Sequence, residues 1–409
     1  MRILLFSLYF VPDIASTGVL MTQLCEDLQK MGHEITVVTT FPHYIAGQIW
    51  PEYRRKIIEK ASHNGIRILR TYIYASDNKE ALPGRVLNYG SFNVLSTIVG
   101  LFSGRQDVII APSPPLTIGL AAYLVSRAKG IPFIYNLQDI YPEVAVKLGA
   151  LKSRPFISFF ERMERFVYDK AEHVTVLSKG FCDNLLRKGV PGNKITIIPN
   201  FADTDFIKPL PKVNDFSKRH GLSDKFVVMH AGNVGFSQDL AGMLECAKLL
   251  YNEARIEFVI VGDGAAKASL QEEARRMRLD NVRFLSFQPR EDLPHLRAAA
   301  DVQVALLKQG IAASSVPCKV YEIMASGRPV IAGLDPGSDT WELIREARCG
   351  ICIEPENPQE LANAVLTLYH DEALRRKLAQ NGRRFVVENN SRQIVAQKYH
   401  DLLQSIVTT

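Results

Sequence analysis

Two glycine-rich turns in the second half of the chain have the composition of phosphate-binding loops. Gly232-Asn233-Val234-Gly235 and Val261-Gly262-Asp263-Gly264 each follow an apolar run that predicts a strand. Where side chains are missing, a phosphate can approach the backbone closely. One such turn is weak evidence, but two at equivalent strand ends predict an anion site, whose candidate residues are Gly232, Asn233, Gly262, Asp263 and Gly264.

A third segment, residues 314–330, combines hydroxyls, a cation and a carboxylate at the start of a predicted helix. Ser314 and Ser315 precede a proline, Lys319 falls in the first turns, and Glu322 follows three residues later. Hydroxyls and helix N–H groups can hold a pyrophosphate, the lysine can neutralise charge that builds on it, and the glutamate can accept ribose hydroxyls. This segment predicts a nucleoside diphosphate site. The alternative is a plain surface ion pair between Lys319 and Glu322.

The first half offers two weaker candidates. The loop from Tyr9 to Gly18 opens into a helix, so Gly18 lies where free N–H groups can bind an anion, or where glycine serves only packing. Asp139 follows the apolar run 133–137, and ligands of open α/β sheets bind beyond the carboxyl ends of strands. Asp139 is therefore a candidate to orient a substrate hydroxyl. The competing interpretation is an N-cap ahead of a helix that starts at Pro142.

The elements that must position these residues form one repeating pattern of strand and helix. Short apolar runs alternate with helical periodicity, which predicts parallel, doubly wound sheets in an α/β fold. Strands are expected at 2–7, 34–39, 66–72, 108–111, 133–137, 174–177 and 195–199, and then at 226–232, 257–261, 282–284, 302–306, 330–332 and 350–353. The chain is thus expected to form two Rossmann-like domains, 1–205 and 206–390. A last helix, about 391–409, has no strand after it and is expected to cross back onto the first domain.

Composition places the chain among ordinary globular proteins. Its 409 residues are 47% hydrophobic and 22% charged, with no disordered or collagen-like bias. The N-terminus does not resemble a signal peptide and the six cysteines are dispersed, which predicts a cytoplasmic protein. Cys349 and Cys352 form a CxxC, but no second pair stands at zinc spacing, and no metal site is expected. The net charge of +6 favours phosphates or lipid headgroups over a nucleic-acid groove.

Two apolar stretches leave membrane contact open. Residues 86–104 carry no charge but include many small polar residues, so an amphipathic helix fits better than a spanning one. Residues 156–166 combine phenylalanines with basic neighbours. For each stretch, burial in the core and docking at a membrane interface remain alternatives. Arg54-Arg55-Lys56 suits a headgroup surface, or is simply a solvated charge run.

Taken together, these motifs resemble the family-4 retaining glycosyltransferases of GT-B fold over nearly the whole chain. Within that family the chain looks most like the bacterial branch that adds fucose-type or N-acetylated amino sugars during O-antigen, capsule or colanic acid assembly. The matching segments are 32–39, Ile198-Pro199-Asn200 with Asp203, 261–264, and Glu322 with 325–332, and for the branch 232–235, Asp139 with 142–143, and 316–319.

The resemblance implies two domains facing a cleft and a retaining transfer that needs no metal or other cofactor. The donor, a UDP-linked N-acetyl amino sugar or next a GDP-fucose type, would lie on the second domain, with Lys319 at its diphosphate and Glu322 at its ribose. Gly18 would lie near the donor phosphate across the cleft. The acceptor on the first domain would be a lipid-pyrophosphate-linked saccharide. The protein would then contact the cytoplasmic face of the inner membrane peripherally and bind no nucleic acid.

Three departures from the family pattern keep alternatives open. Ser314 stands where many relatives carry a glutamate, Asn233 with Ser237 and Gln238 replaces an arginine and a lysine, and Asn136 replaces a frequent histidine. A nucleotide-sugar 2-epimerase on the same fold would need paired acid and base groups around the sugar. A non-catalytic sugar-nucleotide-binding scaffold subunit of a polysaccharide assembly complex is the other alternative.

Overall fold

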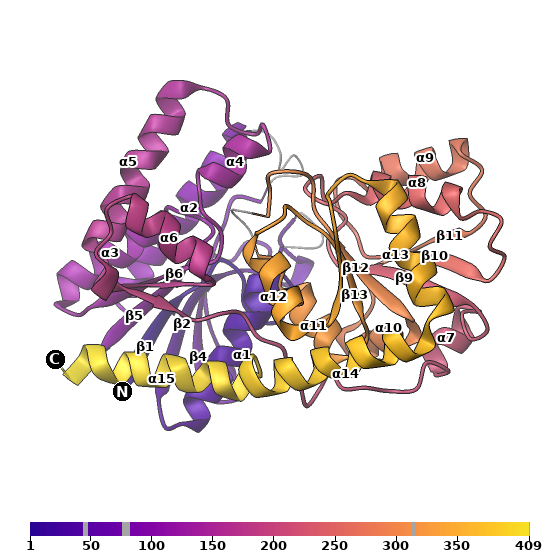
Figure 1. Ribbon diagram of the computed structural model, residues 1–409. Helices are drawn as coiled ribbons and strands as arrows, with labels where there is room; N and C mark the ends of the chain where they lie inside the picture. The colour runs from indigo at the N-terminus through magenta and orange to yellow at the C-terminus, as the bar shows by residue number, and fades with distance from the viewer. Residues whose placement is uncertain (44–47, 76–81, 313–315, 409) are drawn as a thin grey trace. The chain divides into compact units, whose positions relative to one another are not determined.

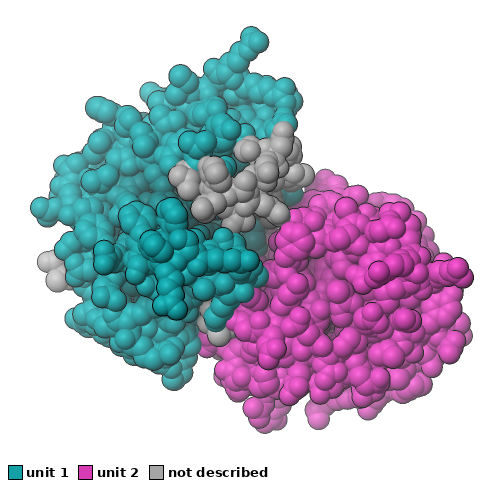
Figure 2. All heavy atoms as spheres, turned by 90° about the horizontal axis from the view of Figure 1, so that it is seen from above, with its two compact units in different colours: residues 1–200, 392–409 teal, residues 201–391 magenta. Residues whose placement is uncertain are grey.

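The computed structural model describes residues 1–43, 48–75, 82–312 and 316–408, which form two compact units. Unit 1 comprises residues 1–200 and 392–409, and unit 2 comprises residues 201–391. The two units are coloured separately in Figure 2. The change from the first unit to the second thus falls five residues before the expected position, and the last helix groups with unit 1.

Unit 1 is built on an eight-stranded sheet with the order β3-β4-β2-β1-β5-β6-β7-β8. Every pairing is parallel except that between β3 and β4. The strands are β1 (Arg2–Phe6), β2 (Glu34–Thr40), β3 (Ile58–His63), β4 (Ile66–Thr71), β5 (Val108–Pro112), β6 (Phe133–Leu137), β7 (His173–Val176) and β8 (Ile195–Ile197). The expected parallel strands are therefore present, and β3 is an addition to them.

The additional strand β3 follows from a two-residue hairpin. Asn64 and Gly65 both have positive φ, 50° and 87°, which is the backbone of the tight turns that join antiparallel strands. The strand is the edge of the sheet and alternates half-buried with exposed residues, so its sequence has no continuous apolar run. Its pattern therefore differs from that of the buried parallel strands of the same sheet.

The helices of unit 1 cover both faces of this sheet. Figure 1 shows α1 with α15 on one side and α2, α3, α5 and α6 on the other. The helices are α1 (Ser16–Lys30), α2 (Leu82–Leu101), α3 (Ile118–Lys129), α4 (Glu143–Lys147), α5 (Arg154–Lys170), α6 (Lys179–Arg187) and α15 (Arg392–Thr408), with short 3₁₀ turns at Pro51–Tyr53 and Gly192–Lys194.

The helix α15 packs on unit 1 through apolar, polar and ionic contacts. Leu403 is fully buried, and Asn136 Nδ2 donates a hydrogen bond to the Tyr399 hydroxyl at 2.7 Å. Arg392 forms ion pairs with Glu26 and Asp27 of α1. Asn136, which replaces a frequent histidine of the family, therefore holds the helix that follows unit 2 in the chain.

Unit 2 contains a wholly parallel six-stranded sheet with the order β11-β10-β9-β12-β13-β14. The strands are β9 (Phe226–Ala231), β10 (Ile256–Val261), β11 (Val282–Leu285), β12 (Val302–Leu306), β13 (Val330–Gly333) and β14 (Gly350–Ile353). The helices are α7 (Asp215–Arg219), α8 (Leu240–Leu249), α9 (Lys267–Arg276), α10 (Leu293–Ala299), α11 (Lys319–Ala325), α12 (Asp339–Ala347), α13 (Pro358–His370) and α14 (Glu372–Asn389), with a 3₁₀ turn at Arg290–Asp292.

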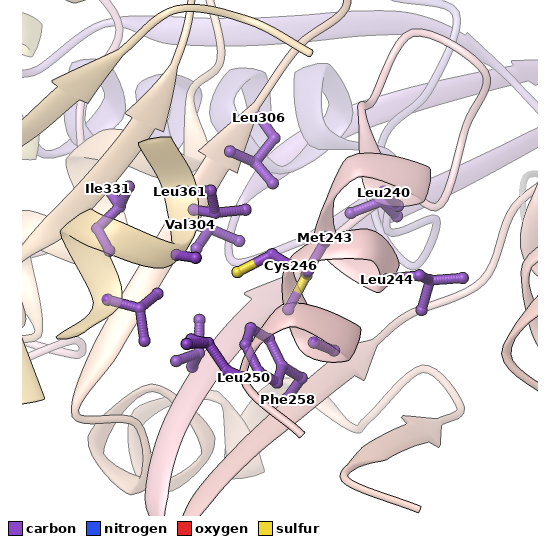
Figure 3. Packing of buried hydrophobic residues seen from close by; sticks show 14 of the residues in the cluster. Leu240, Met243, Leu244, Cys246, Leu250, Phe258, Val304, Leu306, Ile331 and Leu361 are labelled. Atoms are coloured by element: carbon purple, nitrogen blue, oxygen red, sulfur yellow. The ribbon is translucent and has the colours of Figure 1, made fainter. Parts of the chain in front are cut away.

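Strand β9 shows why the strands of unit 2 have apolar residues on both faces. Phe226 and Val228 join a core cluster on one face, and Val227 and Met229 join a second cluster on the other. Because alternate side chains of a strand point to opposite faces, a strand covered on both sides is mostly apolar along its length. Figure 3 shows the first cluster, where α8 packs on the sheet. Both units thus have the expected Rossmann-like α/β architecture.

Within the residues described, no helix has the length and hydropathy needed to cross a membrane. This includes α2, which contains most of the uncharged stretch 86–104.

Candidate functional site

The predicted binding residues of unit 2 gather at the carboxyl edge of its sheet. Strands β10 and β11 follow β9 on one side, whereas β12, β13 and β14 extend from β9 on the other. The connections therefore diverge between β9 and β12, and open α/β sheets bind ligands at such a switch point. Lys319 and Glu322 lie on α11, which follows β12 in the chain, and Asn233 and Gln238 lie in the segment after β9.

The two glycine turns lie directly against each other. A Cβ on Gly262 would approach the carbonyl oxygen of Gly232 to 1.9 Å, and one on Gly264 would approach that of Val234 to 2.4 Å. The backbone N–H of Val234 donates to Asp263 O at 3.0 Å, and that of Gly262 donates to Leu285 O at 3.1 Å. Close packing of the two turns is thus a sufficient reason for Gly262 and Gly264, whatever the turns bind.

The carboxylate of Asp263 braces the loops after β10 and β11. Lys267 Nζ donates to Asp263 Oδ1 at 2.6 Å, and the backbone N–H of Phe287 donates to Asp263 Oδ2 at 2.8 Å. Lys267 Nζ also donates to Gly262 O at 2.8 Å. Asp263 therefore fixes the shape of this edge, and its proposed role in ligand binding stays a prediction.

Lys319 is the first residue of α11, and its ammonium group reaches the loop after β9. Lys319 Nζ donates to Gln238 Oε1 at 2.5 Å. Desolvation, followed by repulsion from Arg297, lowers the pKa of Lys319 to about 7. An anion beside Nζ would oppose this shift, because it stabilises the protonated form, so a negatively charged ligand would raise the pKa of Lys319.

Glu322 is held by a buried network rather than by Lys319. Arg297 Nη2 donates to Glu322 Oε2, and Arg297 Nη1 donates to Gln303 Oε1 at 2.6 Å. The Arg297 side chain is 3% exposed and that of Glu322 is 34% exposed. Only one end of this pair reaches solvent, so the carboxylate is fixed with an accessible side. The surface Lys319–Glu322 ion pair weighed above is not the contact observed.

His230 is a buried polar residue in β9 that the sequence did not single out. Its position is on the face that Phe226 and Val228 share, and burial, with repulsion from Lys319, lowers its pKa well below the usual value. Its Nε2 lies 3.3 Å from Asn233 O, an acceptor, so Nε2 carries the proton in the neutral ring. His230 therefore supports the turn that presents Asn233, which is exposed.

Two further residues of unit 2 were predicted to bind the donor. Ser314 and Ser315 lie outside the described residues. The chain that leads to them is anchored, because the backbone N–H of Gly310 donates to Asp335 Oδ1 at 2.7 Å and that of Ala312 to Asp335 Oδ2 at 3.2 Å.

In unit 1, Gly18 and Asp139 both lie beyond the carboxyl ends of strands. A Cβ on Gly18 would approach Tyr9 Cβ to 2.9 Å, so glycine lets the first turn of α1 pack on the loop before it. Asp139 is half-buried in the turn after β6, and α4 begins at Glu143 with Pro142 as its N-cap. Asp139 is therefore not a helix cap, and the roles proposed for both residues toward substrates stay predictions.

The structure adds one group of buried polar residues to unit 1. Asp13, His43 and Arg70 follow or end strands β1, β2 and β4, and each is under 5% exposed. The backbone N–H of His43 donates to Asp13 Oδ2 at 3.0 Å, and Arg70 Nη1 donates to Thr40 O at 3.4 Å. Nothing in the sequence pattern joins these residues, because the order of strands in the sheet brings them to one edge.

Metal-ligating side chains do not cluster in the described ranges, where no group of three or more His, Cys, Asp or Glu residues is placed to hold an ion. Cys349 and Cys352 are free thiols. Burial raises the pKa of Cys349 to about 12 and that of Cys352 to about 11, so both are protonated at neutral pH.

Two family models match the chain, one to each half. The model described as glycosyl transferases group 1 matches residues 212–385, and the model described as glycosyl transferase 4-like domain matches residues 17–200. Between them they cover the candidate residues of both units.

Curated relatives match at low identity over most of the chain. The putative colanic acid biosynthesis glycosyl transferase WcaI of Escherichia coli is 25% identical over 375 residues, which is 89% of this chain and 91% of the relative. The probable glycosyltransferase WbjE of Pseudomonas aeruginosa is 26% identical over 300 residues, covering 72% of this chain and 74% of the relative.

Solved structures share the fold of the chain. Anabaena Alr3699/HepE in complex with UDP and glucose superposes with a TM-score of 0.75 at 18% identity, covering 99% of this chain and 100% of that one. WaaG, a glycosyltransferase involved in lipopolysaccharide biosynthesis, gives a TM-score of 0.72 at 15% identity, covering 98% of this chain and 99% of its own.

Proposed function

The chain belongs to the group 1, family-4 glycosyltransferases of GT-B fold, and from this premise we propose that it transfers a sugar from a nucleoside diphosphate sugar to a lipid-linked saccharide, with retention of configuration. The wider setting is glycan biosynthesis, in which its relatives act. Both matching models describe glycosyl transferases, which favours a transferase over the epimerase and scaffold alternatives.

The arrangement on α11 is the observation that carries the proposal. Lys319 and Glu322 stand one turn apart at the switch point of the sheet, each held by a neutral or buried partner, Gln238 and Arg297. We infer that Lys319 binds the diphosphate, because among the described residues its ammonium bonds the uncharged Gln238 and no carboxylate, and that Glu322 binds the ribose through its exposed side. Because Lys319 and Glu322 are one helical turn apart, one can bind the diphosphate while the other binds the ribose of the same nucleotide.

The chemical role assigned to Lys319 is stabilisation of the leaving group. When the bond between the anomeric carbon and the phosphate breaks, its electron pair goes to the phosphate oxygen and adds negative charge there. A fixed ammonium in a partly desolvated site stabilises that charge without reorganisation. In a retaining transfer, the acceptor hydroxyl attacks on the side that the nucleotide leaves, and its proton goes to a phosphate oxygen. No metal or enzyme nucleophile enters this scheme.

We assign UDP-linked N-acetyl amino sugars as the first donor class and GDP-fucose types as the second. The fold neighbour that holds UDP and glucose supports a uridine nucleotide, and the colanic acid relative supports a role in polysaccharide assembly. On the acceptor side, Asp139 is proposed to orient the hydroxyl that attacks. The acceptor is proposed to be a lipid-pyrophosphate-linked saccharide at the cytoplasmic face of the inner membrane, in the synthesis of a bacterial surface polysaccharide.

The test is thermal stabilisation of the full chain by a panel of UDP-, GDP- and dTDP-sugars. A ligand that binds only the folded state raises the unfolding temperature, by an amount set by its concentration relative to Kd. We expect one donor class to stabilise the wild type, and Lys319→Met and Glu322→Gln to weaken that effect by about tenfold or more in apparent Kd.

The matched control is Lys248→Met on the exposed side of α8, which should respond as the wild type does. Stabilisation that survives in both α11 variants would move the nucleotide site away from α11. A panel without any stabilising sugar nucleotide would contradict the proposal as a whole.

A further inference from the structure

Unit 1 distributes its apolar surface unevenly between the two sides of its sheet. On the helices α1 and α15, the one exposed large apolar side chain among the described residues is Val407, at 37%. On the opposite side, α3 contacts both α2 and α5 (Figure 1). The outer surface of these three helices carries a series of exposed apolar residues. They are Leu87, Val94, Ile98, Leu101, Phe102, Leu124, Phe156, Phe159 and Phe166.

The apolar residues of α2 and its C-terminal end form a stripe, defined here as Leu87, Val94, Ile98, Leu101 and Phe102. Their spacing places them on one side of a helix with 3.6 residues per turn. Phe102 is 82% exposed, Val94 62% and Leu87 55%. Burial in the core, one of the two alternatives left open for this stretch, therefore does not account for these residues.

The inward side of α2 explains why the stripe is not needed for folding. Phe92 and Val99 are buried there, and a Cβ on Gly100 would approach the ring of Phe6 to 2.5 Å, so a small residue lets the helix lie close to the sheet. A surface helix normally pairs one apolar side with one charged side. Because α2 is apolar on both sides, its outer side is suited to a second apolar environment.

The charges around the stripe are predominantly positive. No charged residue occurs from Val86 to Gly104, and Arg105 at its end and Arg127 on α3 are exposed. On α5 the exposed residues include Arg162, whereas the exposed Arg165 lines a pocket together with Glu161. The exposed acidic residues of α5 are Glu161 and Asp169, and Asp169 pairs with Lys170 at 2.7 Å. The outer surface of α2, α3 and α5 thus combines the apolar stripe with mainly positive charges around it.

This combination selects one occupant. Two copies of the same surface, related by a two-fold axis, would bring like charges together, which costs free energy. A bilayer with anionic headgroups offers apolar chains to the stripe and phosphates to the arginines at the same time. No described helix can span the membrane, so α2 would lie in the plane of the interface.

We propose that the outer surface of α2, α3 and α5 docks unit 1 on an anionic lipid bilayer, with the α2 stripe among the acyl chains and the arginines of α3 and α5 at the headgroups. The binding is a property of unit 1 alone and does not require the transferase activity proposed above.

The experiment is co-sedimentation of the full chain with vesicles of phosphatidylcholine alone or mixed with phosphatidylglycerol. We expect binding to the anionic vesicles that weakens as salt is raised, and little binding to the neutral ones. Val94→Asp with Phe102→Asp should reduce the partition coefficient by about tenfold or more, because two apolar contacts are replaced by anions. Arg127→Gln with Arg162→Gln should weaken binding and flatten its salt dependence.

The matched control is Leu249→Asp with Tyr251→Asp on unit 2, where both residues are about half exposed and nothing should change. Unfolding temperature and stabilisation by UDP show whether each variant is folded, so a loss of docking is separable from a loss of the nucleotide site. The proposal is overturned if anionic vesicles do not bind the wild type or bind the α2 variant equally well. It is also overturned if light scattering finds a dimer without lipid that Phe102→Asp dissociates.

Discussion

At the scale of single residues, the charge of the candidate site depends on the lowered pKa of Lys319. The ammonium is partly buried, has Arg297 nearby, and is hydrogen-bonded to the uncharged Gln238. A neighbouring lysine would lower the pKa further by like-charge repulsion. With glutamine there, the charge of the site depends on the protonation of one residue.

The first prediction concerns the pH dependence of nucleotide affinity. The pKa of Lys319 is about 7 in the free protein and is expected to rise beside a bound diphosphate, so binding takes up a proton at higher pH. Affinity for a sugar nucleotide should be flat below about pH 7 and fall by up to about tenfold per pH unit above it. Calorimetric titration in buffers of different ionisation enthalpy measures this proton uptake.

The matched variant is Lys319→Arg, whose guanidinium stays protonated throughout this range. Its affinity should be lower or equal but independent of pH. If the variant retains the same slope, another group is responsible. If the wild type shows no slope between pH 7 and 9, Lys319 does not contact the diphosphate.

The residues of this site differ in how far the sequence could predict them. Lys319 and Glu322 are recognisable because both belong to one helical segment, where spacing along the chain fixes spacing in space. Arg297 and His230 are not, because each reaches the site from another element. An arginine in α10 and a histidine in an otherwise apolar strand have no local pattern that reveals their partners.

At the scale of elements, the two glycine turns show how a local motif serves packing and presentation together. Gly262 has φ of 141° and lies against the carbonyl oxygen of Gly232, so the edge of β10 can approach that of β9 only without a side chain. Close packing of the two turns helps to position α9 and the segment after β9. Their glycines are therefore as important to the fold of unit 2 as to any ligand.

The second prediction is that Gly262→Ala destabilises the protein by about 3 kcal/mol or more, since the added Cβ meets backbone and φ is unfavourable. Urea unfolding of the wild type and the variant measures the difference. The control is Gly90→Ala on α2, where a Cβ meets nothing within 4 Å and the change should stabilise by roughly 0.5–1 kcal/mol. Equal effects of the two substitutions would contradict this account of the turns.

Buried elements were easier to predict from the sequence than exposed ones. The buried strands are recognisable as apolar runs, because most residues of a sheet covered on both faces are apolar. The edge strand β3 has no apolar run, because its charged, alternating sequence faces solvent on one side, and only the hairpin signal Asn64-Gly65 indicates it. The outward apolar side of α2 was ambiguous for a related reason: apolar periodicity alone does not say which side of a helix faces the core.

At the scale of the whole molecule, the chain returns to unit 1 after it has completed unit 2. Helix α15 contributes buried apolar residues and the Asn136–Tyr399 hydrogen bond to unit 1. Each unit has its own sheet and core, so a change in α15 should be felt in unit 1 first.

The third prediction therefore concerns Leu403→Ala. Removing this fully buried side chain should destabilise unit 1 by about 2–5 kcal/mol, whereas Val407→Ala, at an exposed position of the same helix, should change stability by no more than about 0.5 kcal/mol. Hydrogen exchange should accelerate in β1 and remain unchanged in β9. Faster exchange in β9 to the same degree would show that the two units unfold together.

The position of α15 has a consequence for how the protein is made. A ribosome synthesises β1 to β8 first and then all of unit 2, and only afterwards the helix that covers α1 and binds Asn136. Until then, the surface that α15 will cover is exposed on a nascent chain that already carries the whole of unit 2. The unit whose synthesis begins first is thus completed last, and in the cell this interval is when unit 1 is most exposed to chaperones and proteases.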